Sequence, residues 1–142
     1  MDRYLDTTRN GPMFLRREAI ARLVKNSLKA GERLGHYELH AWVIMANHVH
    51  ALLTPRITPS RLIASLKGAT ARAANKLLAR TGEPFWQGEC YDHWVRDEKE
   101  FSSIRSYIEQ NPVKAGFAAE PAAFRWSSAY DRLDESRRCS HE

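Results

Sequence analysis

The longest apolar run of the chain covers residues 39–55, and both of its halves favour β-strand. Aromatic and β-branched residues dominate these halves, which is the composition of strands packed within a sheet. The residues concerned are Trp42, Val43 and Ile44 in the first half and Val49, Leu52 and Leu53 in the second. Ala46-Asn47 separates the halves and has turn chemistry. The pattern predicts a hairpin from about residue 36 to residue 54, placed centrally in a sheet.

Apolar residues recur at helical spacing in two further segments, about residues 15–30 and 60–81. The first segment has an apolar stripe formed by Ile20, Leu23, Val24 and Leu28. The second has an apolar stripe formed by Leu62, Ile63, Leu66, Ala73, Leu77 and Leu78. Glycine is common just beyond a helix C-terminus, so Gly31 and Gly82 are predicted to end these two helices.

A third helix is predicted to begin after Asp97, whose side chain can accept hydrogen bonds from the first helical turn. Glu100 follows three residues later and completes a pattern like a capping box. The buried stripe of this helix is predicted to consist of Phe101, Ile104 and Ile108. Proline disfavours helical conformation in the residue before it, so Pro112 predicts Asn111 as the last or nearly last helical position.

Short strands are predicted at residues 4–8 and 90–96. From Pro121 onward the chain carries Trp126 and Tyr130, and a polar tail from about residue 131 is expected to fray. The resulting order is strand, helix, two strands, helix, strand, helix. This order is typical of an α+β fold of the ferredoxin-like sandwich type, in which helices pack against an antiparallel sheet.

Composition restricts the class of protein further. A chain of 142 residues is long enough for one domain with a substantial core, and its contents of 43% hydrophobic and 27% charged residues are ordinary for a globular protein. No apolar run reaches the roughly 18–20 residues of a membrane span. Cys90 and Cys139 lack metal-ligand spacing, so we interpret them as free thiols and expect a cytoplasmic protein. The net charge of +5 favours a polyanionic partner without requiring one.

The candidate chemistry begins with His48 and His50, which lie one residue apart in the predicted hairpin. Side chains two residues apart on a strand share a face, so both imidazoles can converge on one metal ion. A lone His-x-His pair in a half-buried strand is more often structural, and the pair needs a third polar group nearby. Asn111 on the third helix is the candidate, with Gln110 as the alternative.

Tyr107 precedes Asn111 by four residues, which places both side chains on one face of the third helix. That face is rotated away from Ile104 and Ile108, which are predicted to anchor the helix to the sheet. The tyrosine and the amide can therefore both be directed toward whatever lies on the sheet surface. Each residue alone has an ordinary structural explanation, as a packing tyrosine and a helix terminator.

A basic row on the second helix is a candidate DNA contact. Arg72, Lys76 and Arg80 recur every fourth residue, and Lys67 flanks the apolar stripe. Such a row can follow a phosphate backbone, although a solvated helix face has the same pattern. Trp86, in an aromatic loop after the second helix, can stack an unpaired base or can belong to the core.

Two blocks of sequence together resemble the HUH single-tyrosine transposases, and among them the REP-associated tyrosine transposases. The first block is residues 45–53, with His48-Val49-His50, and the second is residues 107–116, from Tyr107 to Gly116. Further similarity lies in Ser65-Leu66-Lys67, Phe85-Trp86-Gln87 and Trp126-Ser127-Ser128. Ala46 departs from the family, which usually has proline in this turn, but the change removes no chemical group.

The resemblance implies a transposase that cleaves and rejoins DNA without an external energy source. It implies that His48, His50 and Asn111 bind a divalent metal ion, Mg²⁺ or Mn²⁺, and that Tyr107 is the nucleophile. A free tyrosine has a pKa near 10, so it needs such help to attack a phosphate at neutral pH. The product would be a 5′-phosphotyrosine intermediate. The implied partner is single-stranded DNA folded as a REP-like hairpin.

Two other functions remain open on the sequence alone. A metal-dependent phosphodiesterase would use an activated water as the nucleophile, with Tyr107 in a supporting position. A domesticated protein would bind nucleic-acid hairpins without cutting them, although such a protein has no need of the whole set of candidate residues. The resemblance also leaves open whether the protein acts as a monomer or a homodimer, and whether it mobilises DNA.

Overall fold

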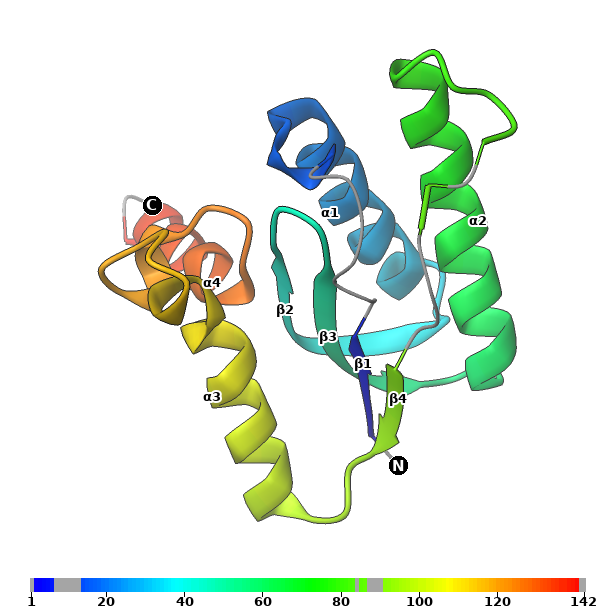
Figure 1. The fold of residues 1–142 in the computed structure, drawn as a ribbon. Helices are drawn as coiled ribbons and strands as arrows, with labels where there is room; N and C mark the ends of the chain where they lie inside the picture. The colour runs from blue at the N-terminus through cyan, green and yellow to red at the C-terminus, as the bar shows by residue number, and fades with distance from the viewer. Residues whose placement is uncertain (1, 7–13, 84, 87–90, 141–142) are drawn as a thin grey trace.

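The computed structural model describes residues 2–6, 14–83, 85–86 and 91–140 (Figure 1). Its strands are β1 (Arg3–Asp6), β2 (Tyr37–Ile44), β3 (Val49–Pro55) and β4 (Tyr91–Trp94). They form an antiparallel sheet in the order β2-β3-β1-β4, so β1 pairs with both β3 and β4. The predicted central hairpin is confirmed as β2 and β3.

Helices cover both faces of the sheet. They are α1 (Glu18–Arg33), α2 (Pro59–Leu77), α3 (Glu98–Lys114) and α4 (Ser128–Cys139), with short 3-10 turns η1 (Phe14–Arg16) and η2 (Pro121–Ala123). Figure 1 shows α1 and α2 on one side of the sheet and α3 and α4 on the other. This arrangement confirms the predicted α+β sandwich with an antiparallel sheet. No helix in the described part of the chain is long and apolar enough to cross a membrane.

The alternation of side chains along β3 separates two cores. Val49, Ala51 and Leu53 pack in the core that α1 and α2 cover. Leu52 points the other way and packs in a second core with Ile108 of α3. Because successive strand residues face opposite sides, the residue between Val49 and Ala51 also faces α3. That residue is His50.

The first helix ends later than the sequence predicts. Gly31 lies within α1, which continues to Arg33, and the chain adopts a positive φ of +79° only at Gly35. A Cβ on Gly31 would collide with the ring of Tyr37 at the start of β2. The prediction that Gly31 ends the helix is wrong, because this glycine lets a helix and a tyrosine ring approach closely.

The second helix is shorter than predicted at its C-terminal end. It stops at Leu77 rather than near residue 81, and Ala79 already has a positive φ of +56° before Gly82 is reached. Leu77 is 60% exposed, so its predicted place in the apolar stripe is wrong, whereas Leu78 packs against the core. The buried positions of α2 are Leu62, Thr70, Ala74 and Asn75.

The third helix does not end at Asn111. It passes through Pro112 and continues to Lys114, so the prediction based on proline is wrong. Pro112 is buried with the helix, and this burial offsets the missing N–H. The true stop is a Schellman motif at Gly116, whose φ is +81°, with Phe117 N donating to the Pro112 carbonyl at 2.8 Å.

The ends of the chain also differ from expectation. The first strand ends at Asp6, and Thr7 and Thr8, the residues predicted to extend it, lie outside the described part. Cys90, predicted to begin the fourth strand, also lies outside this part. The segment expected to fray is helix α4, whose first turn is capped by Ser127. Asp131 ties this helix to α1, because its carboxylate accepts from Lys25 at 2.9 Å and also pairs with Lys29.

Candidate active site

The two histidines lie where the β2–β3 hairpin turns. Met45 N donates to the His48 carbonyl at 2.8 Å across the turn, which places His48 directly before β3. His50 lies within β3, between Val43 of β2 and Asp6 of β1, and both imidazoles are buried. Their ring centroids are 4.7 Å apart, at an interplanar angle of 89°. The two rings therefore lie together on the face that α3 covers.

Neighbouring polar groups fix the orientation of both imidazoles. His50 Nδ1 lies 2.6 Å from the hydroxyl of Tyr4 on β1 and 3.5 Å from Asp6 Oδ1. His48 Nδ1 lies 2.8 Å from Asn47 Oδ1. Since both Nδ1 atoms are engaged in this way, Nε2 is the nitrogen with which each ring can bind a metal. Such hydrogen bonds set the tautomer and the aim of a metal-binding histidine.

Helix α3 brings Tyr107 to the same place. The Tyr107 ring centroid is 5.8 Å from that of His50, at an interplanar angle of 88°, and the side chain is 38% exposed. Tyr107 therefore contacts His50 and is partly open to solvent. The ammonium of Lys114, two helical turns onward, lies 5.5 Å from the Tyr107 ring centroid. This cation was not expected from the sequence.

Asn111 is half-buried and follows Tyr107 by one helical turn, next to the buried Pro112. Gln110 is also half-buried, but its spacing of three residues rotates it further from the direction of Tyr107. The assignment of either amide as a metal ligand stays a prediction. Among the described residues, no group of three His, Cys, Asp or Glu side chains is placed to hold a metal ion.

A carboxylate on the first turn of α3 fixes this helix to the sheet. Asp97 caps the helix by accepting from Glu100 N at 2.8 Å, as the sequence predicts. Glu100 accepts from Arg96 Nε at 2.7 Å and lies 2.8 Å from His93 Nε2 on β4. These bonds, that of Arg96 above all, lower the pKa of Glu100 to about 2. The N-terminal end of α3 is thereby tied to β4.

A second carboxylate secures the middle of α3, two residues beyond Tyr107. Glu109 is buried and accepts from the Ser128 hydroxyl at 2.8 Å and from Arg132 of α4 at 2.7 Å. The Ser128 oxygen in turn accepts from the backbone N–H of Trp42 on β2 at 3.0 Å. Sequence reasoning missed this network, because only the packing of α4 against β2 brings its members together.

Tyr4, Asp6 and Asn47 were also missed. Asn47 carries a local signal, because it adjoins His48 in a predicted turn where an amide commonly bonds its neighbours. Tyr4 and Asp6 reach His50 only through the pairing of β1 with β3. Nothing in their own sequence neighbourhood indicates that pairing.

The predicted DNA-contacting residues lie on the opposite side of the sheet from Tyr107. Arg72 and Lys76 are exposed on α2, whereas Lys67 is half-buried. Arg80 is partly engaged within the fold, with its Nε 2.7 Å from Glu83 and its guanidinium 4.7 Å from the ring centroid of Phe14. A role for this row in binding DNA stays a prediction.

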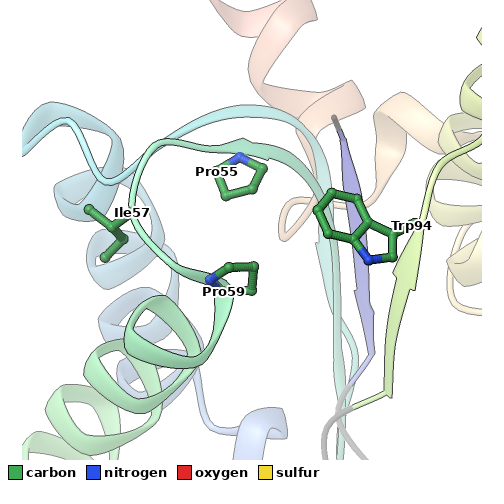
Figure 2. A pocket seen from close by; sticks show the side chains of 4 residues that line it. All are labelled: Pro55, Ile57, Pro59 and Trp94. Atoms are coloured by element: carbon green, nitrogen blue, oxygen red, sulfur yellow. The ribbon is translucent and has the colours of Figure 1, made fainter.

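Trp86 packs at the edge of the core rather than standing in solvent. Its indole N–H donates to the Thr70 hydroxyl at 2.8 Å, and its ring lies edge-on to Phe85 at 5.0 Å between centroids. A more exposed tryptophan, Trp94, borders a separate open pocket (Figure 2). That pocket lies at the end of β3 remote from His50, and it includes none of the predicted site residues.

Comparison with known proteins gives the family. The sequence model described as "Transposase IS200 like" matches residues 12–111, which is more than half of the chain and includes both histidines, Tyr107 and Asn111. The chain belongs to the IS200-like transposase family. It is thus a DNA-processing transposase by family, and this family is generally metal-dependent. The comparison with curated proteins gave no significant match.

Two solved structures share the fold of this transposase. One is a REP-associated tyrosine transposase bound to a REP hairpin, 18% identical, with a TM-score of 0.77 over 95% of this chain and 80% of that one. The other is a transposase from Deinococcus radiodurans R1, described there as putative, 25% identical, with a TM-score of 0.56 over 78% of this chain and 89% of that one. At these identities the first comparison establishes the fold alone.

Proposed function

We propose that this transposase cleaves and rejoins single-stranded DNA through a covalent bond to Tyr107. The observation that carries the proposal is the position of the Tyr107 ring, 5.8 Å from the ring of His50, which in turn lies 4.7 Å from the ring of His48. A nucleophile beside a pair of oriented imidazoles, open to solvent on one side, is suited to a phosphodiester held against the sheet.

His48 and His50 would bind a divalent metal through Nε2, and the amide oxygen of Asn111 would be the third ligand. The donor set fits such an ion, because both imidazoles are held in one orientation by partners on Nδ1. Mixed nitrogen and oxygen donors with open positions are compatible with Mg²⁺ or Mn²⁺. When bound, the ion would supply a Lewis acid for a phosphate oxygen.

In the cleavage step, Tyr107 Oη forms a bond to phosphorus while the bond from phosphorus to the 3′ oxygen breaks. The phenolic proton is lost and the 3′ oxygen gains one, so the products are a 5′-phosphotyrosine and a 3′-hydroxyl. One phosphodiester replaces another, and attack by a 3′-hydroxyl reverses the step. Lys114 contributes positive charge beside the Tyr107 ring, where it would attract the phosphate that the hydroxyl attacks.

The proposed substrate is a DNA hairpin of the REP type with single-stranded flanks. The similarity in fold to a transposase bound to a REP hairpin supports this choice, together with the net charge of +5. Arg72 and Lys76 are the exposed members of the α2 row that would contact phosphates. Neutralising phosphates in this way would make binding strongly dependent on salt concentration.

The test is a search for a covalent adduct. The purified protein is mixed with labelled hairpins from palindromes flanking its gene, in Mg²⁺ or Mn²⁺, and run on a denaturing gel. We expect a metal-dependent band of protein joined to DNA that disappears in Tyr107→Phe and persists in Tyr130→Phe, a matched change on α4. Cleaved DNA without an adduct would instead support a water-using phosphodiesterase. Hairpins that bind and stay intact in every metal and on both strands would support a binding protein.

A further inference from the structure

A small pocket with aromatic walls includes Ala46 of the β2–β3 turn, the turn that precedes His48. Its volume is about 230 Å³, below the roughly 300–1,000 Å³ of pockets for drug-sized ligands, so it suits a single flat ring. The residues that matter for its chemistry are Arg16, Ile44, Ala46, Phe117, Phe124 and Trp126. None of them belongs to the set of candidate ligands, nucleophile or basic row described above.

Both elements that carry the proposed catalytic groups contribute to this pocket. Ala46 lies in the β2–β3 turn, two residues before His48. Phe117 follows the end of α3, where its backbone N–H donates to the carbonyl of Pro112, the residue after Asn111. The pocket is therefore linked to the candidate active site through the β2–β3 turn and the C-terminal end of α3.

Among the aromatic walls, Phe117 is exposed, whereas Phe124 and Trp126 are half-buried. Phe117 is 55% exposed, although the residue at this position of a Schellman motif usually packs onto its own helix. Its ring centroid is 6.4 Å from that of Phe124. The backbone of Trp126 is held by its carbonyl, which accepts from Ile44 N at 2.8 Å. Aromatic side chains on an anchored backbone have only two side-chain bonds to immobilise when a planar ligand stacks on them.

The border of the pocket is basic. Arg16 lines it, and the guanidinium of Arg125 lies 4.7 Å from the Trp126 ring centroid. Glu18 is the acidic neighbour, and its carboxylate is paired with Arg125 at 2.8 Å and with Arg22 at 2.6 Å. Two guanidinium groups thus pair with this carboxylate, and Arg16 adds a third positive charge at the pocket. The excess of positive charge favours an anionic ligand that also carries a flat ring.

We propose that this pocket binds one unpaired nucleobase of single-stranded DNA, from a nucleotide adjacent to the bond that Tyr107 attacks. The inference rests on the proposed function for the position of the base relative to the cleaved bond. Stacking on the exposed ring of Phe117 would hold the base, while the arginines would hold its phosphates. Seating that base would fix the register of the strand at the active site.

The experiment measures binding in a Tyr107→Phe background, so that cleavage does not interfere. The probes are a fluorescent oligothymidine of about 20 nucleotides, longer than the usual site size of single-strand-binding folds, and an abasic strand of the same length. The variants are Phe117→Ala, Phe117→Tyr, which retains a ring, and Leu34→Ala. Leu34 is the control, because it is 72% exposed but lies at the end of α1 outside the pocket.

We expect Phe117→Ala to weaken binding of oligothymidine about 5- to 150-fold, the range of one base stacking on an aromatic ring, and to leave binding of the abasic strand unchanged. Phe117→Tyr should restore most of the affinity, and Leu34→Ala should have no effect. Equal loss on both strands, or no loss on either, would overturn the pocket proposal. So would a change of oligomeric state on size-exclusion chromatography, which would identify the pocket as a contact between copies.

This outcome is independent of the adduct search. If the wild-type protein forms no adduct but Phe117→Ala weakens binding only when bases are present, the pocket binds a base as proposed, whereas the cleavage and the position of that base beside a cleaved bond fail. If the adduct forms and Phe117→Ala binds both strands like its parent, the cleavage proposal stands and the pocket proposal fails.

Discussion

Removal of the Tyr4 hydroxyl tests whether β1 sets the aim of His50. In Tyr4→Phe the ring stays in place and only the oxygen that lies 2.6 Å from His50 Nδ1 is lost. A buried hydrogen-bonding group left without its partner costs about 1–3 kcal/mol. For a chain of this length, a loss of that size lowers the melting temperature by roughly 2–4 °C for each kcal/mol.

Tyr4→Phe should also weaken the binding of a metal ion at His50. Changes in groups that orient a metal-binding histidine typically reduce metal affinity by about 10- to 100-fold. We therefore expect Tyr4→Phe to weaken Mn²⁺ binding by about that factor, as measured by isothermal titration calorimetry, and to raise the metal concentration needed for cleavage. His48 depends on Asn47 instead, so binding should be weakened rather than lost.

The matched control is Tyr37→Phe. The Tyr37 hydroxyl donates to the Leu28 carbonyl in the other core, so its removal should lower stability by a similar amount without changing Mn²⁺ affinity. Equal metal affinity in both variants and in the parent protein would refute the argument. Tyr4 would then be a packing residue whose hydroxyl has no influence on the site.

Three further predictions concern the rest of the fold. Arg96 and His93 hold the pKa of Glu100 at about 2, below the ordinary 4.5, so the ionised carboxylate stabilises the fold fully above pH 4.5 and this contribution is lost as the pH falls toward 2. Glu100→Gln should therefore lower the melting temperature at pH 6 and flatten the decline of the melting temperature between pH 4.5 and 2. Arg72→Ala combined with Lys76→Ala should reduce the slope of log binding constant against log salt by about 1.4, at roughly 0.7 for each contact with single-stranded DNA, and an unchanged slope would make the row ordinary surface. Gly31→Ala should destabilise the protein by about 1–3 kcal/mol in urea unfolding, because the added methyl group meets a buried ring, and a neutral effect would contradict that packing.

The sequence by itself determined the local features of this protein. The two faces of β3 follow from the period of two along a strand, so His48 and His50 could be assigned to one face from spacing alone. The cap at Asp97 follows from a hydrogen bond that spans three residues. In each case the interacting groups lie within one element or its adjoining turn, and the pattern of neighbours is enough to predict them.

Only the tertiary structure decided which distant groups meet. Tyr4 and His50 are 46 residues apart in sequence, and the Tyr4 hydroxyl reaches His50 because β1 pairs with β3. Glu109 meets Ser128 because α4 packs against β2. The same reason explains the errors at Gly31 and Asn111. Local preferences predicted a helix end at each position, and contacts with Tyr37 in one case and burial of Pro112 in the other outweighed them. Such local preferences amount to about 1 kcal/mol for glycine and about 3 kcal/mol for proline within a helix, and the packing between elements overrides them.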